Sequence, residues 1–157
     1  MSPERLPAPT LQFFAALSVQ VDRPQEIGRT PNGLRRVIPI LGGDVQGEGW
    51  TGKVLPGGAD FQLLPSDTLA QLDARYVIET DAGDRIFVMN RAVRSAPAEV
   101  TARLVRGEAV DPSLVYFRCS PVFETAAPSL AWINERMFIG SGMRRPDRVE
   151  MTFYVVV

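Results

Sequence analysis

The sequence contains no histidine. Histidine is the usual general base of a nucleophilic triad and the commonest protein ligand of transition metals. Its absence excludes triads built on imidazole, and it excludes zinc, copper and haem sites that bind through His. A Ca²⁺ or Mg²⁺ site made only of carboxylates is compatible with the composition, but the chain has no D-x-D-x-D-G loop. We therefore expect neither a metal nor a cofactor.

Cysteine and lysine are almost as scarce. The single cysteine, Cys119, cannot form an internal disulfide, and Lys53 is the only lysine among 17 basic residues. The first residues, 1–5, lack the apolar stretch of a secretory signal. A chain without disulfides or such a signal is typical of the cytoplasm, and we expect that location.

Long apolar runs and blocks of like charge are also missing. Mean hydropathy is −0.00, which does not favour a membrane segment. The 17 basic and 18 acidic residues are spread along the chain and leave a net charge of −1. Because no cluster of one sign could attract phosphate backbones or anionic lipid, we expect a soluble protein that binds neither nucleic acid nor a membrane.

The chain does contain frequent turn signals. Its 157 residues suffice for one core, and its 13 glycines and 13 prolines recur at short intervals without a linker-like block, so we expect a single domain over 1–157. Between the turns lie segments rich in β-branched and aromatic residues, which predict strands. The predicted strands are Leu11–Val21, Arg35–Leu41, Asp44–Leu55, Asp60–Leu64, Leu69–Thr80, Arg85–Ala92, Leu114–Thr125, Arg136–Met143 and Arg148–Val157.

Helical periodicity is confined to residues 98–106, where Val100 and Leu104 share one side and Gly107 ends the segment. About eight to ten antiparallel strands with one short helix favour an all-β barrel, because closure removes exposed sheet edges; a β-sandwich is the alternative. The C-terminal run Met151–Val157 is strongly strand-forming, so it must pair inside the barrel or across a subunit interface. A homodimer is predicted on that ground.

Two predicted strands have faces that differ sharply in polarity, because residues two apart share a face. The polar face of Leu69–Thr80 carries Asp73 and Arg75, and its opposite face carries Leu72, Ala74 and Tyr76. The later strand, Leu114–Thr125, shows the same alternation. Its more polar face carries Tyr116, Arg118, Ser120, Val122 and Glu124, and its apolar face carries Val115, Phe117, Cys119, Pro121 and Phe123. The polar faces either form the wet outside of the barrel or line an interior site, since a barrel of this size can hold a ligand. The pattern alone does not decide between them.

Short motifs in the same order along most of the chain resemble the domain of unknown function 3237 family. They are Gly57-Gly58-Ala59-Asp60, Leu72-Asp73-Ala74-Arg75-Tyr76, Tyr116-Phe117-Arg118, Phe123-Glu124-Thr125, Trp132-Ile133-Asn134 and Phe138-Ile139-Gly140-Ser141-Gly142. Ile133 stands where leucine is usual in that family, and Cys119 where threonine is common. The resemblance implies a single small β-barrel with a polar-mouthed cavity. The recurring motif residues of that family match Asp60, Asp73, Arg75, Tyr76, Tyr116, Arg118, Glu124, Trp132 and Asn134 in this sequence.

If the polar faces point inward, arginines and carboxylates of alternating sign form a site for a small molecule. A partly isolated carboxylate would have a raised pKa and could transfer a proton, and arginine would hold a developing oxyanion. The predicted catalytic residues are Asp73 and Glu124. The predicted substrate-binding residues are Asp60, Arg75, Tyr76, Tyr116, Arg118, Trp132 and Asn134.

Three functions follow from this site. The first is a cofactor-independent isomerase, cyclase or lyase that acts on an apolar carbonyl or carboxylate metabolite. The second is a non-catalytic binding protein for an anionic or aromatic metabolite, and the third is a structural or interaction barrel in which the same ions tie strands together.

Two further motifs have simple structural explanations. Residues 47–52 match G-x-G-x-x-G, but the turn that follows them predicts a bent strand rather than the helix of a dinucleotide site. Cys119 alternates with Phe117 and Phe123, which indicates a core residue. Trp132 is suited to closing a barrel end, and Asn134 to capping a turn.

Overall fold

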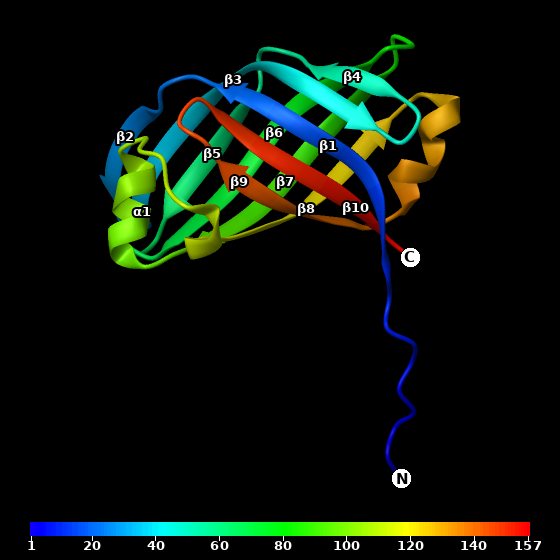
Figure 1. Ribbon diagram of the computed structural model, residues 1–157, viewed down its shortest axis with the longest axis horizontal. Helices are drawn as coiled ribbons and strands as arrows, with labels where there is room; N and C mark the ends of the chain where they lie inside the picture. The colour runs from blue at the N-terminus through cyan, green and yellow to red at the C-terminus, as the bar shows by residue number, and fades with distance from the viewer.

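The computed structural model describes residues 1–157 and consists mainly of β-strands (Figure 1). One α-helix and two short 3₁₀ helices connect them. The elements are β1 (Leu11–Val21), β2 (Gln25–Thr30), β3 (Gly33–Gly47), β4 (Thr51–Val54), β5 (Ala59–Leu64), β6 (Leu69–Thr80), β7 (Arg85–Ser95), α1 (Ala98–Val105), η1 (Pro112–Leu114), β8 (Tyr116–Thr125), η2 (Pro128–Glu135), β9 (Phe138–Arg144) and β10 (Arg148–Val156).

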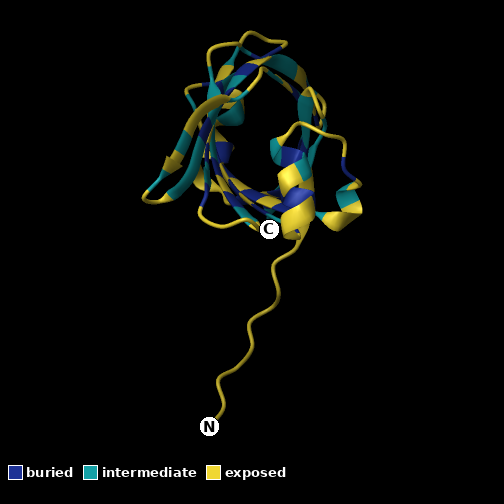
Figure 2. Cartoon of the chain, turned by 90° about the vertical axis from the view of Figure 1, so that its left-hand side faces the viewer, coloured by how far each residue is buried: buried dark blue, intermediate teal, exposed yellow.

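The strands form a closed antiparallel barrel. Neighbouring strands pair in the order β1-β10-β9-β8-β7-β6, and β1 pairs in turn with β3. Between β6 and β3, β4 and β5 occupy two halves of one position, so the ring has eight positions, and β2 pairs with β3 outside it. Figure 2 looks into this ring from the end that carries α1. The predicted all-β barrel is therefore confirmed, and the sandwich alternative is wrong.

Most predicted strands coincide with observed ones within a few residues, but residues 25–55 differ. Residues 35–41 and 44–55 were expected as two strands, whereas β3 runs unbroken through Gly42 and Gly43 and β4 is short. The glycine pair looks like a turn in sequence, yet it pairs with β1 at Gln20 and Val19. Sequence reasoning missed β2, because this strand is short, largely exposed and interrupted by Gly28.

The seam that closes the barrel depends on a close approach of two backbones. At Gly43, β3 pairs with Val19 of β1, and a Cβ atom at this position would overlap the backbone oxygen of Ser18. Only glycine lets the two strands lie this close.

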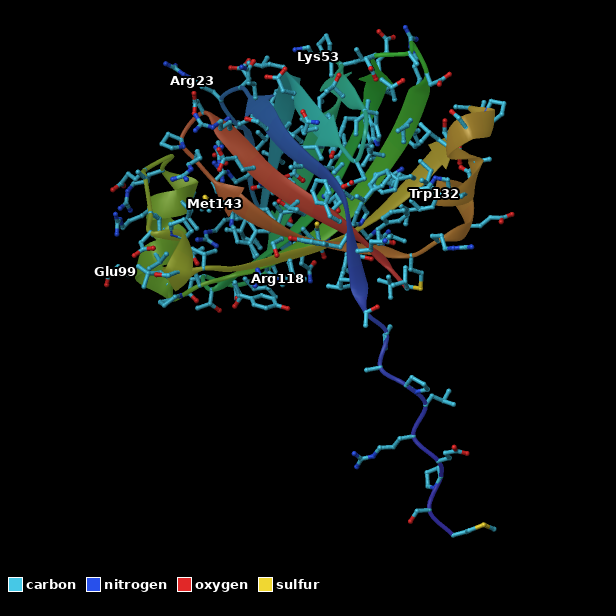
Figure 3. The ribbon with its side chains drawn as sticks, turned by 45° about the vertical axis from the view of Figure 1, so that its right-hand side comes forward. Arg23, Lys53, Glu99, Arg118, Trp132 and Met143 are labelled. Atoms are coloured by element: carbon cyan, nitrogen blue, oxygen red, sulfur yellow. The ribbon has the colours of Figure 1, made fainter.

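One half of the interior is filled by aromatic rings. Phe123 and Phe138 pack with ring centroids 4.7 Å apart, and Phe14 lies 5.0 Å from Phe138 and 5.3 Å from Phe123. Trp132, carried by η2, packs edge-on against Phe14 at 5.7 Å, on the side of the barrel opposite α1 (Figure 3). Edge-to-face contacts at these distances stabilise the cluster beyond simple area burial.

The opposite end of the barrel is bordered by α1. This helix matches the predicted segment 98–106, and Gly107 follows it with φ +79°. Val100 and Leu104 pack with Ala96 and Val110 in a small satellite cluster. No helix of the chain is both long and apolar enough to cross a membrane.

The C-terminal strand β10 is paired on both edges, with β1 and with β9. The homodimer was predicted because this strand needs hydrogen-bonded neighbours, and both neighbours come from the same chain. The homodimer itself stays a prediction.

We expect Gly43→Ala to lower the free energy of unfolding by about 3 kcal/mol or more, because the added Cβ forces β1 and β3 apart. Gly57→Ala is the matched control, since Gly57 also has a positive φ of +107° but has nothing within 4 Å of the added atom. We expect the control to lose only about 1 kcal/mol. Urea unfolding measures both, and equal losses would contradict the role of Gly43 in closure.

Candidate functional site in the barrel interior

The two polar strand faces lie on the outside of the barrel. Arg75, Arg118 and Glu124 are exposed, and Asp73 is half-buried, while the alternating neighbours Leu72, Tyr76 and Phe117 belong to the core. The interpretation that polar faces form the wet outside is confirmed for β6 and β8. On β5 it is wrong, because Asp60 and Gln62 face the interior and Phe61 is exposed. A pocket walled by Asp73, Arg75, Arg118 and Glu124 is not formed inside, because burying the apolar face of each strand turns these side chains outward.

On the outer wall several predicted residues do come together. Asp73 Oδ2 lies 3.4 Å from Arg75 Nη2, and the Arg118 guanidinium lies 5.2 Å from the centroid of the Tyr116 ring. Asp73, Tyr116 and Arg118 line an open groove of about 820 Å³, and Arg118 lies on the outer side of the barrel (Figure 3). Glu124 and Arg75 line a separate depression. The Asp73–Arg75 ion pair is exposed to solvent, and such a pair contributes little to stability.

Asp60 and Tyr76 are the two predicted site residues that point into the barrel. Both line an internal cavity of about 50 Å³. Five polar residues that sequence reasoning did not select lie in the same interior: Arg36, Gln62, Asn90, Arg94 and Arg144.

The cavity has one polar side and one apolar side. Asp60 and Gln62 come from β5, Asn90 and Arg94 from β7, and Arg144 from β9. The small side chains of Ala74 on β6 and Ala92 on β7 leave room for the cavity. The lining residues of low polarity are Val19, Val21, Ile38, Ile40, Leu72, Ala74, Ala92, Phe117, Val149 and Met151.

Asp60 is the carboxylate of this interior. Its Oδ2 accepts a hydrogen bond of 2.9 Å from Gln62 Nε2, whereas its Oδ1 is buried and has no partner. Burial raises the pKa of Asp60, and the hydrogen bond from Gln62 and the positive charge of Arg94 only partly offset this effect. A carboxyl group in such surroundings holds its proton more readily than one in water.

The interior guanidinium groups differ in how they are paired. Arg36 Nε donates to Glu26 Oε1 at 2.9 Å, and its Nη2 donates to the carbonyl oxygen of Val105 at 3.0 Å. Arg94 and Arg144 take part in none of the salt bridges of the chain. Burial lowers the pKa of Arg94 to about 10 and also lowers the pKa of Arg144.

Arg94 is only 4% exposed and has no salt-bridge partner. Burying its charge in this way lowers the stability of the fold unless another group compensates it. Asp60 and Arg94 are near enough to influence each other's pKa but lie beyond salt-bridge distance. Gln62 Oε1 and Asn90 Oδ1 are also buried without a donor. A native interior rarely leaves so many polar atoms unsatisfied, so the arrangement fits a site that is completed by a ligand or by water.

Tyr76 and Cys119 are neutral groups of the interior. Burial raises the pKa of both side chains, that of Cys119 to about 12. The Cys119 thiol therefore stays protonated at neutral pH and is a core residue rather than a nucleophile.

The remaining predicted site residues hold the η2 region in place. Asn134 Oδ1 accepts from the backbone N–H of Thr125 at 2.8 Å, and Asn134 Nδ2 donates to the Thr125 carbonyl at 3.0 Å. Trp132 covers the aromatic cluster. Neither residue lines the cavity. No group of three or more His, Cys, Asp or Glu side chains comes together in a way that could hold a metal ion.

Fold and interior together define the protein as a small closed β-barrel with a charged internal site. The chain also matches, over residues 9–156, the model of the family described as "Protein of unknown function (DUF3237)". It belongs to this family, as its sequence motifs predict.

Curated relatives and solved structures agree with this assignment. The chain is 43% identical over 151 residues to a UPF0311 protein of Rhodopseudomonas palustris, covering 95% of this chain and 99% of that protein. A crystal structure of an R. palustris protein of unknown function superposes with a TM-score of 0.90 at 40% identity, covering 98% of this chain and all (100%) of that one. A β-barrel like protein of Acinetobacter baumannii gives 0.85 at 36% identity, over 99% and 100%.

A more distant structure shares the fold alone. It is a crystal structure of an enzyme from Penicillium herquei, with a TM-score of 0.74 at 17% identity, covering 99% of this chain and 100% of that chain.

The interior residues that sequence reasoning missed did leave a signal. On the inward face of β7, Asn90 and Arg94 interrupt an apolar series of Ile86, Val88 and Ala92. Arg36 interrupts the corresponding face of β3 beside Ile38 and Ile40. A polar residue on an otherwise apolar strand face is a stronger indication of a site than a uniformly polar face.

We expect Asp60→Asn to alter the pH dependence of stability. Because the pKa of Asp60 is raised in the folded state, its favourable contribution is complete below about pH 4 and is lost as the pH rises through the folded pKa. The free energy of unfolding of the unaltered protein should therefore fall relative to that of Asp60→Asn as the pH rises above about 4. Urea unfolding at several pH values measures this difference. Asp44→Asn, which removes an exposed carboxylate paired with Lys53, should show no such trend.

Proposed function

We propose that the barrel interior binds a small molecule and that the protein is a cofactor-independent isomerase, cyclase or lyase, with Asp60 as its acid and base. The observation that carries the proposal is the state of Asp60. Its carboxyl group lines the cavity, its pKa is raised, and its Oδ1 has no hydrogen-bond partner. Groups with such properties in a cavity are typical of functional sites. The proposal moves the acid–base role from Asp73 and Glu124, which lie outside.

The chemistry is proton transfer beside a carbonyl group. The ionised Asp60 carboxylate takes a proton from the carbon next to the carbonyl, and the electron pair moves onto the carbonyl oxygen. Arg94 supplies positive charge for the resulting enolate. Return of the proton to another atom gives an isomer, whereas loss of a leaving group from the adjacent carbon gives an elimination.

Non-catalytic binding of an anionic metabolite is a second candidate. The two interior guanidinium groups without a carboxylate partner, Arg94 and Arg144, support anion binding whether or not a reaction follows. A third role, in association, is supported by the exposed side chains of the outer wall, including Phe61, Tyr116 and Val122, which would suit a second subunit. The lone buried cysteine supports a cytoplasmic setting for any of these roles.

Exchange of carbon-bound hydrogen in D₂O tests the catalytic proposal. We expect the protein to accelerate deuterium incorporation next to the carbonyl of pyruvate or butanone, followed by ¹H NMR. Asp60→Asn should reduce the acceleration by about 100-fold or more.

Three further variants sharpen this test. Asp73→Asn and Glu124→Gln should retain exchange, because both carboxylates lie on the outer wall. Asp44→Asn controls for the loss of a surface charge. Exchange that survives Asp60→Asn but disappears in Asp73→Asn or Glu124→Gln would place the chemistry on the outer wall, and exchange in none of the samples would favour a non-catalytic binder.

A further inference from the structure

We propose that the ligand of the interior site is a short-chain carboxylate with a hydroxyl group on the neighbouring carbon, either a 2-hydroxy acid or the enol form of a 2-oxo acid. The inference rests on the proposed function, because it names the class of molecule for the same cavity. It is carried by the hydrogen-bonding groups of the cavity wall, by its charge and by its size.

The charge of the interior calls for an anion. Arg36 is neutralised by Glu26. Arg144 donates one hydrogen bond to the carbonyl oxygen of Arg148 at 3.4 Å but has no carboxylate in salt-bridge contact, and Asp60 is the only carboxyl that lines the cavity with Arg94 and Arg144. With Asp60 ionised the wall carries an excess of one positive charge, and with Asp60 protonated it carries two. A ligand carboxylate placed at Arg94 and Arg144 would neutralise this excess and accept hydrogen bonds from planar guanidinium donors.

The unsatisfied oxygens call for a hydrogen-bond donor on the same ligand. Asp60 Oδ1, Gln62 Oε1 and Asn90 Oδ1 are all buried acceptors without a donor, and all three residues line the cavity. Gln62 and Asn90 are 2% and 4% exposed, so bulk water does not solvate them. A simple carboxylate has only acceptor oxygens and would leave these atoms unpaired, whereas a hydroxyl group would donate to one of them.

The donors and acceptors all lie on three strands of one wall, β5, β7 and β9. Asp60 pairs in register with Ala74, and Ala74 with Asn90, so Asp60 of β5 and Asn90 of β7 lie at the same level of the inner wall, on either side of the small Ala74 side chain of β6. Arg94 lies two inward positions further along β7 from Asn90. A molecule that spans this wall therefore meets cationic donors at one end and acceptor oxygens at the other.

The size of the cavity limits the length of the ligand. A volume of about 50 Å³ admits only a small group of atoms, so the cavity suits a short-chain ligand rather than an extended one. The opposite wall, which includes Val19, Ile40 and Met151, is apolar and suits a methyl or methylene group. An enol intermediate of a three-carbon 2-oxo acid presents this same pattern of carboxylate, hydroxyl and small apolar carbon.

Protein-observed NMR titration with lactate tests the inference without any measurement of activity. Lactate carries the full pattern in a stable molecule, propionate lacks the hydroxyl, and lactamide lacks the negative charge. We expect lactate to bind about tenfold more tightly than either analogue. The amide shifts should map to β5, β7 and β9 around the cavity.

Two arginine variants on β7 test whether lactate binds in the interior. Arg94→Met should weaken lactate binding by about tenfold or more, because it removes the more deeply buried of the two guanidinium groups that line the cavity. Arg91→Met removes an exposed arginine on the opposite face of the same strand and should leave binding unchanged. The spectrum of each variant shows whether it is folded, and the comparison of lactate with its analogues needs no variant at all.

The outcomes separate this inference from the proposed function. Equal affinity for lactate, propionate and lactamide, or no binding of any of them, overturns the ligand class even if Asp60-dependent exchange of butanone is observed. Selective binding of lactate without any exchange supports the ligand class and contradicts the catalytic proposal. Shifts confined to the groove lined by Asp73 and Arg118 would overturn the interior location.

Discussion

Closure of the sheet between β1 and β3 is the constraint on which the rest of the structure depends. Once β3 accepts β1 on one edge and β4 and β5 on the other, every barrel strand has one face that points into an enclosed space. That space has to be filled at close to crystalline density, or kept polar and hydrated. The backbone contact at Gly43 is thus the local feature that turns a long sheet into a container.

The chain fills the two halves of this container differently. Towards η2 the interior is packed with Phe14, Phe123 and Phe138, and Trp132 of η2 covers them. In the other part, alanine residues on β6 and β7 leave a small space, and charged and amide side chains border it. Buried charges without direct partners reduce stability, so a purely structural account of Arg94 and Asp60 explains less than a site completed by a ligand.

The outer wall has the reverse character. Its arginines and carboxylates form ion pairs in contact with water, where the pairing energy is small. The family motifs include residues of both surfaces: Asp60 and Tyr76 inside, Asp73, Arg75 and Arg118 outside. Motif membership therefore does not by itself separate groups that line the cavity from groups that face the solvent.

The sequence by itself determined the fold class, most strand positions, the α1 segment and the absence of imidazole chemistry. These are local properties: two-residue alternation, β-branched and aromatic content, and turn residues depend on neighbours along the chain. Local pattern also placed Tyr76 and Cys119 on apolar strand faces. It did not reveal β2, nor the passage of β3 through Gly42 and Gly43, because both depend on pairing between distant segments.

Only the tertiary structure decided which polar residues share an enclosed site. Strand alternation shows that Asp73 and Leu72 face opposite ways, but it does not say which way is inward until the sheet closes and the apolar faces meet. The gathering of Asp60, Arg94 and Arg144 from β5, β7 and β9 is likewise invisible along the chain, since these residues are brought together by the curvature of the barrel. Their unpaired charge, which gives the cavity its chemistry, is a property of that three-dimensional arrangement alone.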